Sequence, residues 1–462
     1  MLHVGGAAAL PLGPQIAAGN AAIAQNGKLM SITNTPGAIL NWQGFSIDVG
    51  ETVRFIQQNA QSAVLNRVVG QNPSAILGSL QSNGRVFLIN PNGIVFGAGA
   101  RIDVAGLVAS SLDIKDADFL AGRHSYSGGG HGVVSNQGTI TAADGGAVYL
   151  IGPGVDNRGV INAPNGDIIL AAGQTVIVAP AAAPDVRVQI TAPAQGEAIN
   201  LGELIARSGS IGIYGVNVTQ GGSVDASRAL AGADGRIFLK ADKTVLASVG
   251  SRTVADGGAI EIDSGELTRV DSGAALRADG GRIRLWSDAE TEVHGTLRAR
   301  GGFVETSGRH LDVNSIDLDV AGGEWLIDPS NISIENTNVL GSPLATCGAV
   351  SGGSQTCGLG ASGAGFTHLD AGVINTALNN DTSVVIDTAV GTGGSGNIQL
   401  YGSLLLSKSS GTRATLTLNA DNVIGANGGT PTISASNGAI LDVVLSANRG
   451  TVSAGGGING LG

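Results

Sequence analysis

A few acidic side chains in this sequence lie close enough together to suggest catalysis. Asp113, Asp116 and Asp118 fall within six residues, and Asp317 and Asp319 would share one face of an extended strand. Pairs of carboxylates can cleave glycosidic bonds. Neither group has the neighbouring basic or histidine residues that would accompany sugar cleavage. We therefore favour a solvated acidic surface over an active site.

Two histidines and two cysteines are the other candidates for chemistry. His124 and His131 could approach one another, but two histidines without a third ligand are a weak metal signal. Cys347 and Cys357 enclose the loop GAVSGGSQT, a spacing that suits either a local disulfide in an exported protein or two free thiols. No nucleophile-elbow, zinc-protease, phosphate-loop or dinucleotide motif is present. The sequence predicts no enzyme, no metal site and no cofactor.

The sequence Asn90-Pro91-Asn92-Gly93-Ile94 interrupts an apolar stretch and predicts a tight turn. Pro91 would fix its own φ, and Asn92 and Gly93 would supply two positive-φ positions. The side chains of Asn90 and Asn92 could bond backbone groups of this chain or of a strand from another protein.

A second polar pair, Asn66 and Arg67, lies within the apolar stretch SAVLNRVVG at 62–70. Arg67 could pair with a nearby carboxylate or remain solvated. We expect Asn66, Arg67 and residues 90–94 either to shape a turn and the first coil or to form a surface that a partner recognises. Both roles can hold, because a misfolded turn would also abolish recognition.

Short strands must position these residues. The chain has 75 Gly among 462 residues, with 42% hydrophobic and 3% aromatic residues, which disfavours long helices, collagen and disordered linkers. One phrase recurs, as GRIFL at 235–239, GGAIEI at 257–262, GGRIRL at 280–285 and GGFVET at 301–306. A unit of about 22 residues cannot bury its apolar face alone but can do so when stacked. The repeat predicts an all-β, right-handed parallel β-helix with a narrow aliphatic core and glycine at the corners. A β-sandwich is the alternative.

The net charge is −11 and the sequence pI is near 4.9. Nucleic acid is therefore excluded as a partner, because its phosphates require a basic face. No stretch of about 20 apolar residues predicts a transmembrane helix. The small, apolar start resembles the tail of a secretion signal, although it lacks a basic region.

The repeat and its interruptions divide the chain. We expect a signal remnant or disordered segment at 1–27, and a secretion domain with an N-terminal β cap and first coils at 28–135. The β-helix would occupy 136–334, a cysteine-containing loop 335–365, and further, truncated repeats 366–462. The cap is expected at 28–56, because exposed strand edges would otherwise recruit other chains.

Residues 28–114 resemble the secretion domain of two-partner-secretion exoproteins (TpsA), the filamentous-haemagglutinin and high-molecular-weight-adhesin family of Gram-negative bacteria. The resemblance rests on AILNWQGFSIDVGETVRFIQ at 38–57, SAVLNRVVG at 62–70 and GRVFLINPNGIVFGAGARIDVAGLVASSLDI at 84–114. GGFVETSGRHLDV at 301–313 and GGEWLIDPSNISI at 322–334 extend it. An additional Asn-Pro-Asn-Leu motif of some members is absent, since that region reads FIQQNAQSA. This sides with the adhesin-like subgroup.

The resemblance implies export to the periplasm and recognition by an outer-membrane barrel transporter with periplasmic domains (TpsB-type). The transporter-recognition residues would be Asn66, Arg67, Asn90, Pro91, Asn92, Gly93 and Ile94. The product would be a secreted or cell-surface virulence protein whose β-helical stalk serves adhesion or haemagglutination through an unidentified receptor on a host or neighbouring cell. The alternatives are a contact-dependent toxin, a haemolysin or a haem-acquisition protein that uses the same secretion domain, and, less favoured, a β-helical polysaccharide lyase or hydrolase.

Overall fold

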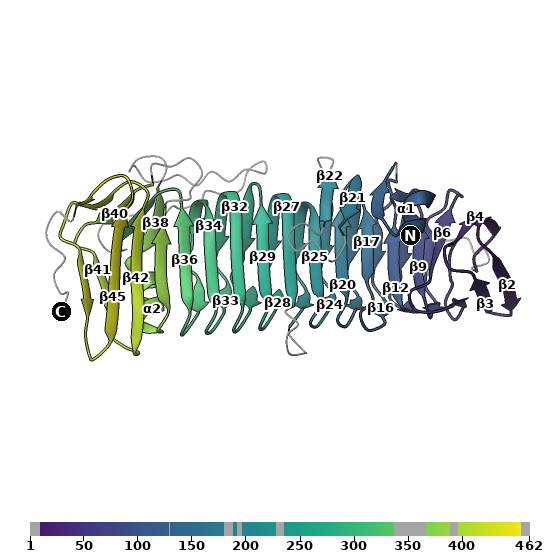
Figure 1. Cartoon of the computed structure of the whole chain (residues 1–462), viewed down its shortest axis with the longest axis horizontal. Helices are drawn as coiled ribbons and strands as arrows, with labels where there is room; N and C mark the ends of the chain where they lie inside the picture. Colours follow the sequence, from purple (N-terminus) through teal and green to yellow (C-terminus); the bar gives the residue numbers. More distant parts are fainter. Residues whose placement is uncertain are drawn as a thin grey trace, which may run out of the picture. The chain divides into compact units, whose positions relative to one another are not determined.

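A computed structural model describes residues 10–128, 130–179, 188–191, 196–227, 235–336, 366–388 and 396–453. The chain divides into two units, residues 1–258 and 259–462. Strands dominate the described part of both units (Figure 1). Neither helix of the described segments has the length and apolar content needed to cross a bilayer.

Each complete coil of unit 1 contains three short strands, and strands of successive coils pair in parallel to form three columns, A, B and C. Column A contains β4 (Ala38–Trp42), β6 (Ala63–Val68), β9 (Arg85–Ile89), β12 (Gly106–Ser110), β17 (Val148–Gly152), β20 (Asp167–Ala172) and the first parts of β25 (Ser210–Gln220) and β27 (Arg236–Ala247). Column B contains β7 (Ser74–Ile76), β10 (Ile94–Phe96), β15 (Val134–Asn136), β18 (Gly154–Asn157), β23 (Glu197–Asn200) and the last parts of β25 and β27. Column C contains β3 (Leu29–Asn34), β5 (Thr52–Ile56), β8 (Ser79–Ser82), β11 (Arg101–Val104), β16 (Thr139–Ala142), β19 (Val160–Asn162), β24 (Glu203–Ile205), β26 (Ser223–Asp225) and β28 (Arg252–Val254). This architecture confirms the predicted parallel β-helix.

The register of these strands reproduces the repeat seen in the sequence. Ser79 lies beside Arg101 and Thr139 beside Val160, steps of about 22 residues. Column C strands alternate between exposed and buried side chains, as in β11. Column A differs, because β12 and β17 are buried along their whole length. Another layer must therefore cover the outer face of column A.

Two insertions between columns A and B provide that layer. β13 (Asp113–Ile114) and β14 (His124–Ser127) come from the first insertion, together with the short helix α1 (Asp116–Leu120). β21 (Thr175–Val178) and β22 (Val188–Thr191) come from the second. The four strands pair antiparallel in the order β13, β14, β21, β22. We call this four-stranded sheet with α1 the cover sheet.

An N-terminal β cap closes unit 1, as predicted, but it begins earlier in the chain. β1 (Gln15–Ala18) pairs antiparallel with β4, and β2 (Ala21–Asn26) pairs antiparallel with β3. Both strands lie in the segment 1–27 that the sequence assigned to a signal remnant or disorder. A two-residue turn joins β2 to β3, and its first residue, Gly27, has φ +57°. Tight hairpin turns of this kind favour glycine at the first turn position, because that position needs a positive φ.

Buried amide side chains form a ladder inside unit 1 at the ends of column B strands. Asn136 Nδ2 donates to Asn157 Oδ1 at 2.8 Å, Asn157 Nδ2 to Asn200 Oδ1 at 2.8 Å, and Asn200 Nδ2 to Gln220 Oε1 at 2.7 Å. All four side chains are fully buried. This asparagine ladder satisfies polar groups that would otherwise be costly inside the core.

Unit 2 repeats the coil architecture. Its strands are β29 (Ala259–Ser264), β30 (Leu267–Val270), β31 (Ala275–Arg277), β32 (Arg282–Val293), β33 (Thr296–Arg298), β34 (Phe303–Asp312), β35 (Asp317–Asp319), β36 (Glu324–Pro329), β37 (Ile332–Glu335), β38 (Thr367–Asp370), β39 (Ser383–Asp387), β40 (Ile398–Tyr401), β41 (Leu405–Lys408), β42 (Arg413–Ala420), β43 (Ile424–Asn427), β44 (Thr432–Ala435), β45 (Ile440–Ala447) and β46 (Val452–Ser453). Helix α2 (Ala371–Asn379) begins after Asp370, whose side chain accepts a bond from Gly372 N. The fully buried Lys408 donates to Leu378 O at the end of α2 and to Asp381.

The paired glycines of the repeat have two different roles. Gly301 has φ +64°, the conformation expected at a sharp corner. The next residue, Gly302, lies so close to the preceding coil that a Cβ atom there would come within 2.2 Å of Gly281 O. The repeat therefore needs its second glycine so that the backbones of successive coils can approach closely. The sequence prediction assigned glycine only to the corners.

Candidate functional site

The Asn-Pro-Asn-Gly turn connects β9 to β10. The side chain of its first asparagine, Asn90, forms hydrogen bonds only within this chain. Asn90 is fully buried. Its Nδ2 donates to Asn72 O and to Ser74 Oγ, both at 3.0 Å, and its Oδ1 accepts from Asn92 N and Asn92 Nδ2. Asn90 thus joins its own turn to the preceding coil and has no free atom for a partner.

The rest of the turn differs from the prediction at one position. Gly93 N donates to Asn90 O at 3.0 Å, and Gly93 has φ +107°. Asn92 is not among the residues with positive φ, so only one of the two expected positive-φ positions exists. The reason is that Pro91 and Asn92 occupy the two central positions of a four-residue turn, and Gly93 occupies its last position. Both central residues of such a turn favour negative φ values. Asn92 is exposed, and its Nδ2 also donates to Gly70 O.

Asn66 is likewise a buried structural residue. It accepts a bond from Trp42 Nε1 at 3.0 Å and donates to Phe87 O at 3.3 Å, which links three successive column A strands. Ile94, the last residue of the motif, is buried as well, and its N–H donates to Val133 O. These residues shape the first coils from within.

Arg67 fastens the cover sheet to column A. Its Nε donates to Asp113 Oδ1 at 2.9 Å, and its Nη2 donates to Ile114 O at 2.7 Å and Asp116 Oδ1 at 2.9 Å. Burial lowers the pKa of Arg67, but bonds to the two carboxylates and their charges outweigh this and raise it. The sequence left open whether Arg67 pairs with a nearby carboxylate or stays solvated. In the structure it pairs with two nearby carboxylates.

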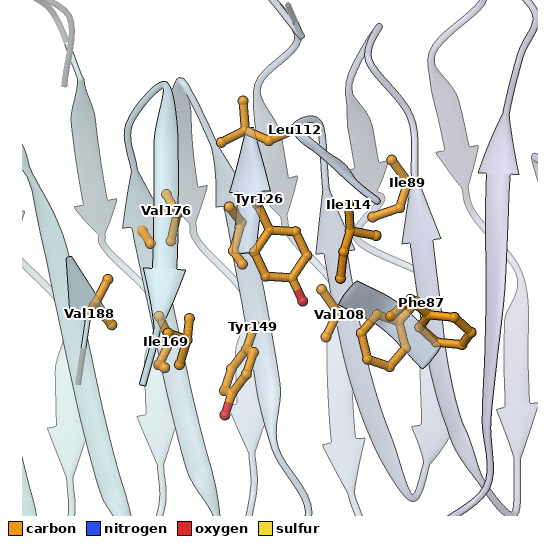
Figure 2. Packing of buried hydrophobic residues seen from close by; sticks show 14 of the residues in the cluster. Phe87, Ile89, Val108, Leu112, Ile114, Tyr126, Tyr149, Ile169, Val176 and Val188 are labelled. Carbon is orange, nitrogen blue, oxygen red and sulfur yellow. The ribbon is translucent and has the colours of Figure 1, made fainter. Parts of the chain in front are cut away.

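The cover sheet and column A enclose an apolar cluster that the sequence reasoning did not identify (Figure 2). Outward-facing column A residues in register supply one side, namely Ile39, Leu65, Phe87, Val108, Tyr149 and Ile169. The cover sheet supplies the other side with Ile114, Phe119, Tyr126, Val176, Val178 and Val188. The sequence does hold a signal for this second apolar layer, because residues 86–89 are all apolar. A strand that is buried on both faces loses the alternation of polar and apolar side chains.

His124 lies against this cluster, where its ring contacts Phe87 and Tyr149. Its ring stacks on Phe87, and its Nδ1 lies 2.8 Å from Tyr126 Oη. Burial and the charge of Arg85 lower the pKa of His124, which keeps the ring neutral near pH 7. His131 is exposed and follows the first insertion, and its N–H donates to Pro91 O. No contact between the two histidines is found in the described part of the chain.

Four of the five acidic candidates form ion pairs, and the fifth, Asp317, accepts a hydrogen bond; Asp113 and Asp116 pair with Arg67. Asp118 pairs with Arg123, and Asp319 pairs with Arg300. Asp317 accepts a bond from Thr296 Oγ1. Among the described residues there is no group of three or more His, Cys, Asp or Glu side chains that could hold a metal ion. Cys347 and Cys357 lie outside the described residues.

One buried carboxyl in unit 2 was not anticipated. Asp328 is 8% exposed, and its Oδ1 has no hydrogen-bond partner among the residues that the structure describes. Burial, together with the charges of Asp387 and Glu305, raises the pKa of Asp328 to about 7.

Comparisons with known proteins place this geometry in context. The family model described as the TPS secretion domain matches residues 12–262. A heme/hemopexin-binding protein of Haemophilus influenzae strain Rd is 36% identical over 182 residues, which is 36% of this chain and 19% of that protein. A second heme/hemopexin-binding protein from Haemophilus influenzae is 44% identical over 78 residues, 17% of this chain and 8% of that protein.

The matched stretches therefore span less than a fifth of the length of these two relatives. Among solved structures, the HMW1 secretion domain from Haemophilus influenzae is similar, with 24% identity and a TM-score of 0.49 over 96% of this chain and 100% of that one.

Proposed function

The chain belongs to the TPS secretion domain family, and from this premise we propose that its unit 1 is recognised by the periplasmic part of an outer-membrane barrel transporter of the TpsB type. The family match carries the proposal, because residues 12–262 contain the cap, the Asn-Pro-Asn-Gly turn and the cover sheet. The exoprotein would then reach the cell surface or the medium of a Gram-negative bacterium.

Within this proposal most of the motif residues act by positioning. Asn66, Asn90 and Ile94 are buried, and Arg67 holds the cover sheet. They stabilise the first coils, and recognition depends on them indirectly. Asn92 is the exposed asparagine of the motif, so it is the one placed to contact a partner directly.

The β-helical coils of unit 2 fit a stalk for adhesion or haemagglutination. The repeated coil supports this proposal. Each coil of a solenoid contacts only the coils next to it, so coils can be added one after another to build a long stalk. A β-solenoid in this family is typical of non-enzymatic exoproteins. Bond cleavage on incubation with pectin-like or alginate-like polymers would instead favour a polysaccharide enzyme.

Haem acquisition is the second candidate, and one observation favours it. Both relatives are heme/hemopexin-binding proteins, so the exoprotein could capture haem or a haem carrier. The test is titration of the purified chain with hemin while the haem absorption band is followed. A saturable shift at one equivalent would support haem binding by this chain, and an unchanged spectrum would count against it.

The secretion proposal is tested by producing the full chain, preceded by an export signal, in a Gram-negative host with and without a TpsB-type transporter taken from the genome that encodes the chain. We expect the chain in the medium only when the transporter is present. Asn90→Ala and Asn92→Ala should each reduce export. Equal amounts of the chain in the medium with and without the transporter would refute the proposal. Unchanged export of both variants would show that the Asn-Pro-Asn-Gly motif is not needed for recognition.

A further inference from the structure

A histidine of unit 2 lies between two carboxylates that belong to successive coils. His294 directly follows β32, and its side chain is half-buried. Its Nε2 lies 3.8 Å from Glu292 Oε2 in its own coil and 3.9 Å from Asp312 Oδ2 in the next coil. At the other nitrogen of the ring, Nδ1 lies 2.7 Å from the side-chain oxygen of Ser315, in the turn that follows β34. One imidazole ring therefore connects two coils.

The strand register gives the charge of this ring a role. Glu292 in β32 pairs with Asp312 in β34, so two negative side chains lie directly opposite one another. Like charges at opposed positions destabilise a pair of strands. Arg269, on the preceding coil, lies 3.5 Å from Glu292 but closer to Asp271, at 2.8 Å. A positive charge on His294 offsets the repulsion, because the ring is within ion-pair distance of both opposed carboxylates.

Two further titratable groups lie on the same strands. Glu290 and His310 are opposite one another, two residues before the carboxylate pair. Burial, and then the charges of Glu292 and Asp312, raise the pKa of Glu290. Burial and the charge of Arg309 lower the pKa of His310, which keeps this second ring neutral near pH 7. The groups on β32 and β34 that face His294 are therefore mainly acidic.

The titratable groups of the elements beside the turn have partners of their own. Strand β38 contacts the turn through Asn314, whose Nδ2 donates to His368 O. His368 Nδ1 lies 3.0 Å from Glu335 Oε1, and Asp370 accepts a bond from the first turn of α2. Asp317, just after the turn, accepts a bond from the first residue of β33. The contacts at both nitrogens of His294 thus come from β32, β34 and the turn itself.

The folded chain favours the protonated form of this ring. Contact with Glu292 and the charge of Asp312 raise the pKa of His294 by more than burial and the charge of Arg269 lower it. A protonated imidazole carries an N–H on both nitrogens, so it can donate to Ser315 while it faces the carboxylates. The stability that it adds is complete below the pKa of an unfolded histidine, 6.5, and is lost as the pH rises through the higher folded pKa.

We propose that His294 is a pH-operated clamp between two coils of unit 2. Protonation of the ring holds the turn at 313–316 against the end of β32, and deprotonation releases this turn and leaves the two opposed carboxylates to repel each other. The clamp does not depend on recognition by the transporter. It makes these coils hold together more tightly when the surroundings of the secreted chain become mildly acidic.

Hydrogen exchange followed by mass spectrometry on the full chain measures the clamp. The reporters are peptides covering residues 310–319, because Asp317 N donates to the carbonyl of Gly295, the residue after His294. Protection is expressed relative to an unfolded peptide at the same pH, which removes the pH dependence of exchange itself. We expect this protection to be at least about threefold higher at about pH 5.5 than at about pH 8.

Three variants separate the clamp from other effects of pH. His294→Gln cannot gain a charge, so the difference between the two pH values should disappear. His294→Lys is charged at both pH values and should keep, at about pH 8, the protection that the unaltered chain has at about pH 5.5. A misfolded variant would not show such a gain. His310→Gln is the matched control, because it removes the neighbouring histidine of β34, and its pH difference should equal that of the unaltered chain.

Four results would overturn the clamp. They are an undiminished pH difference in His294→Gln, loss of that difference in His310→Gln, and equal protection of the unaltered chain at both pH values. The fourth is exchange in His294→Lys at about pH 8 that is as fast as in the unaltered chain. Each of these results would leave transporter-dependent secretion standing, because export is measured separately.

Discussion

Replacing Asn90 by alanine should loosen the first coils of unit 1 far more than replacing Asn92. Asn90 is fully buried, and its side chain makes bonds to Asn72 O, Ser74 Oγ, Asn92 N and Asn92 Nδ2. Each such bond contributes roughly 1 kcal/mol net, and buried partners left unpaired add to the cost. We expect Asn90→Ala to lower the local stability by about 3 kcal/mol.

Asn92→Ala is the matched comparison within the same turn. Asn92 is exposed, so the Gly70 carbonyl that loses its Nδ2 donor can bond water instead. Asn90 Oδ1 still accepts a bond from the backbone N–H of residue 92. Its loss should cost about 1 kcal/mol or less.

Hydrogen exchange followed by mass spectrometry measures this difference in the full chain. Peptides covering residues 85–96 should exchange about a hundredfold faster in Asn90→Ala, since about 1.4 kcal/mol corresponds to a factor of ten. In Asn92→Ala the same peptides should change by less than about tenfold. Equal effects of the two variants, or no acceleration in Asn90→Ala, would refute the assignment of Asn90 to an internal scaffold role.

Three other perturbations test separate parts of the structure. Arg67→Ala should cost about 2 kcal/mol and accelerate hydrogen exchange in residues 113–127 while peptides from column C stay protected; protection of 113–127 would contradict the fastening role. Asn157→Ala should lower the melting temperature of unit 1 by leaving two rungs of the asparagine ladder unpaired, at about 3 kcal/mol, whereas an unchanged melting temperature would argue against the ladder. The pKa of Asp328 is about 7 in the folded chain against 3.8 unfolded, so the folded state binds this proton more tightly and is favoured at low pH. Stability of unit 2 should fall by up to about 4 kcal/mol between about pH 4 and 7, Asp328→Asn should reduce that fall in calorimetric scans, and an identical pH profile in the variant would contradict the raised pKa.

The coils could be predicted from the sequence because their cause is local and repeated. The step from Gly281 to Gly302 is the length of one coil, and Arg282 lies beside Phe303 in the structure. The asparagine ladder left a similar signal that was overlooked, since Asn136, Asn157 and Asn200 each stand two residues before a glycine. Periodicity of polar residues inside the core was as informative as that of the aliphatic ones.

The cover sheet could not be predicted in the same way, because its pairing is long-range and outside the repeat. β14 finds its partner in β21, with His124 beside Val178, and β13 has only two residues. The ion pairs of Arg67 depend on that pairing, so sequence alone left its role open. The N-terminal hairpin was missed for another reason: its strand is rich in small residues and resembles a secretion signal, and only the glycine of the turn distinguishes it.

Site-specific photo-crosslinking during secretion tests the central account most directly. A photoreactive residue in place of the exposed Asn92 of the full chain, activated in cells that are exporting it, should capture the transporter's periplasmic region. One in place of the exposed Val249 should not. Capture from position 249 but not from position 92, or efficient export with no crosslink from position 92, would contradict the account.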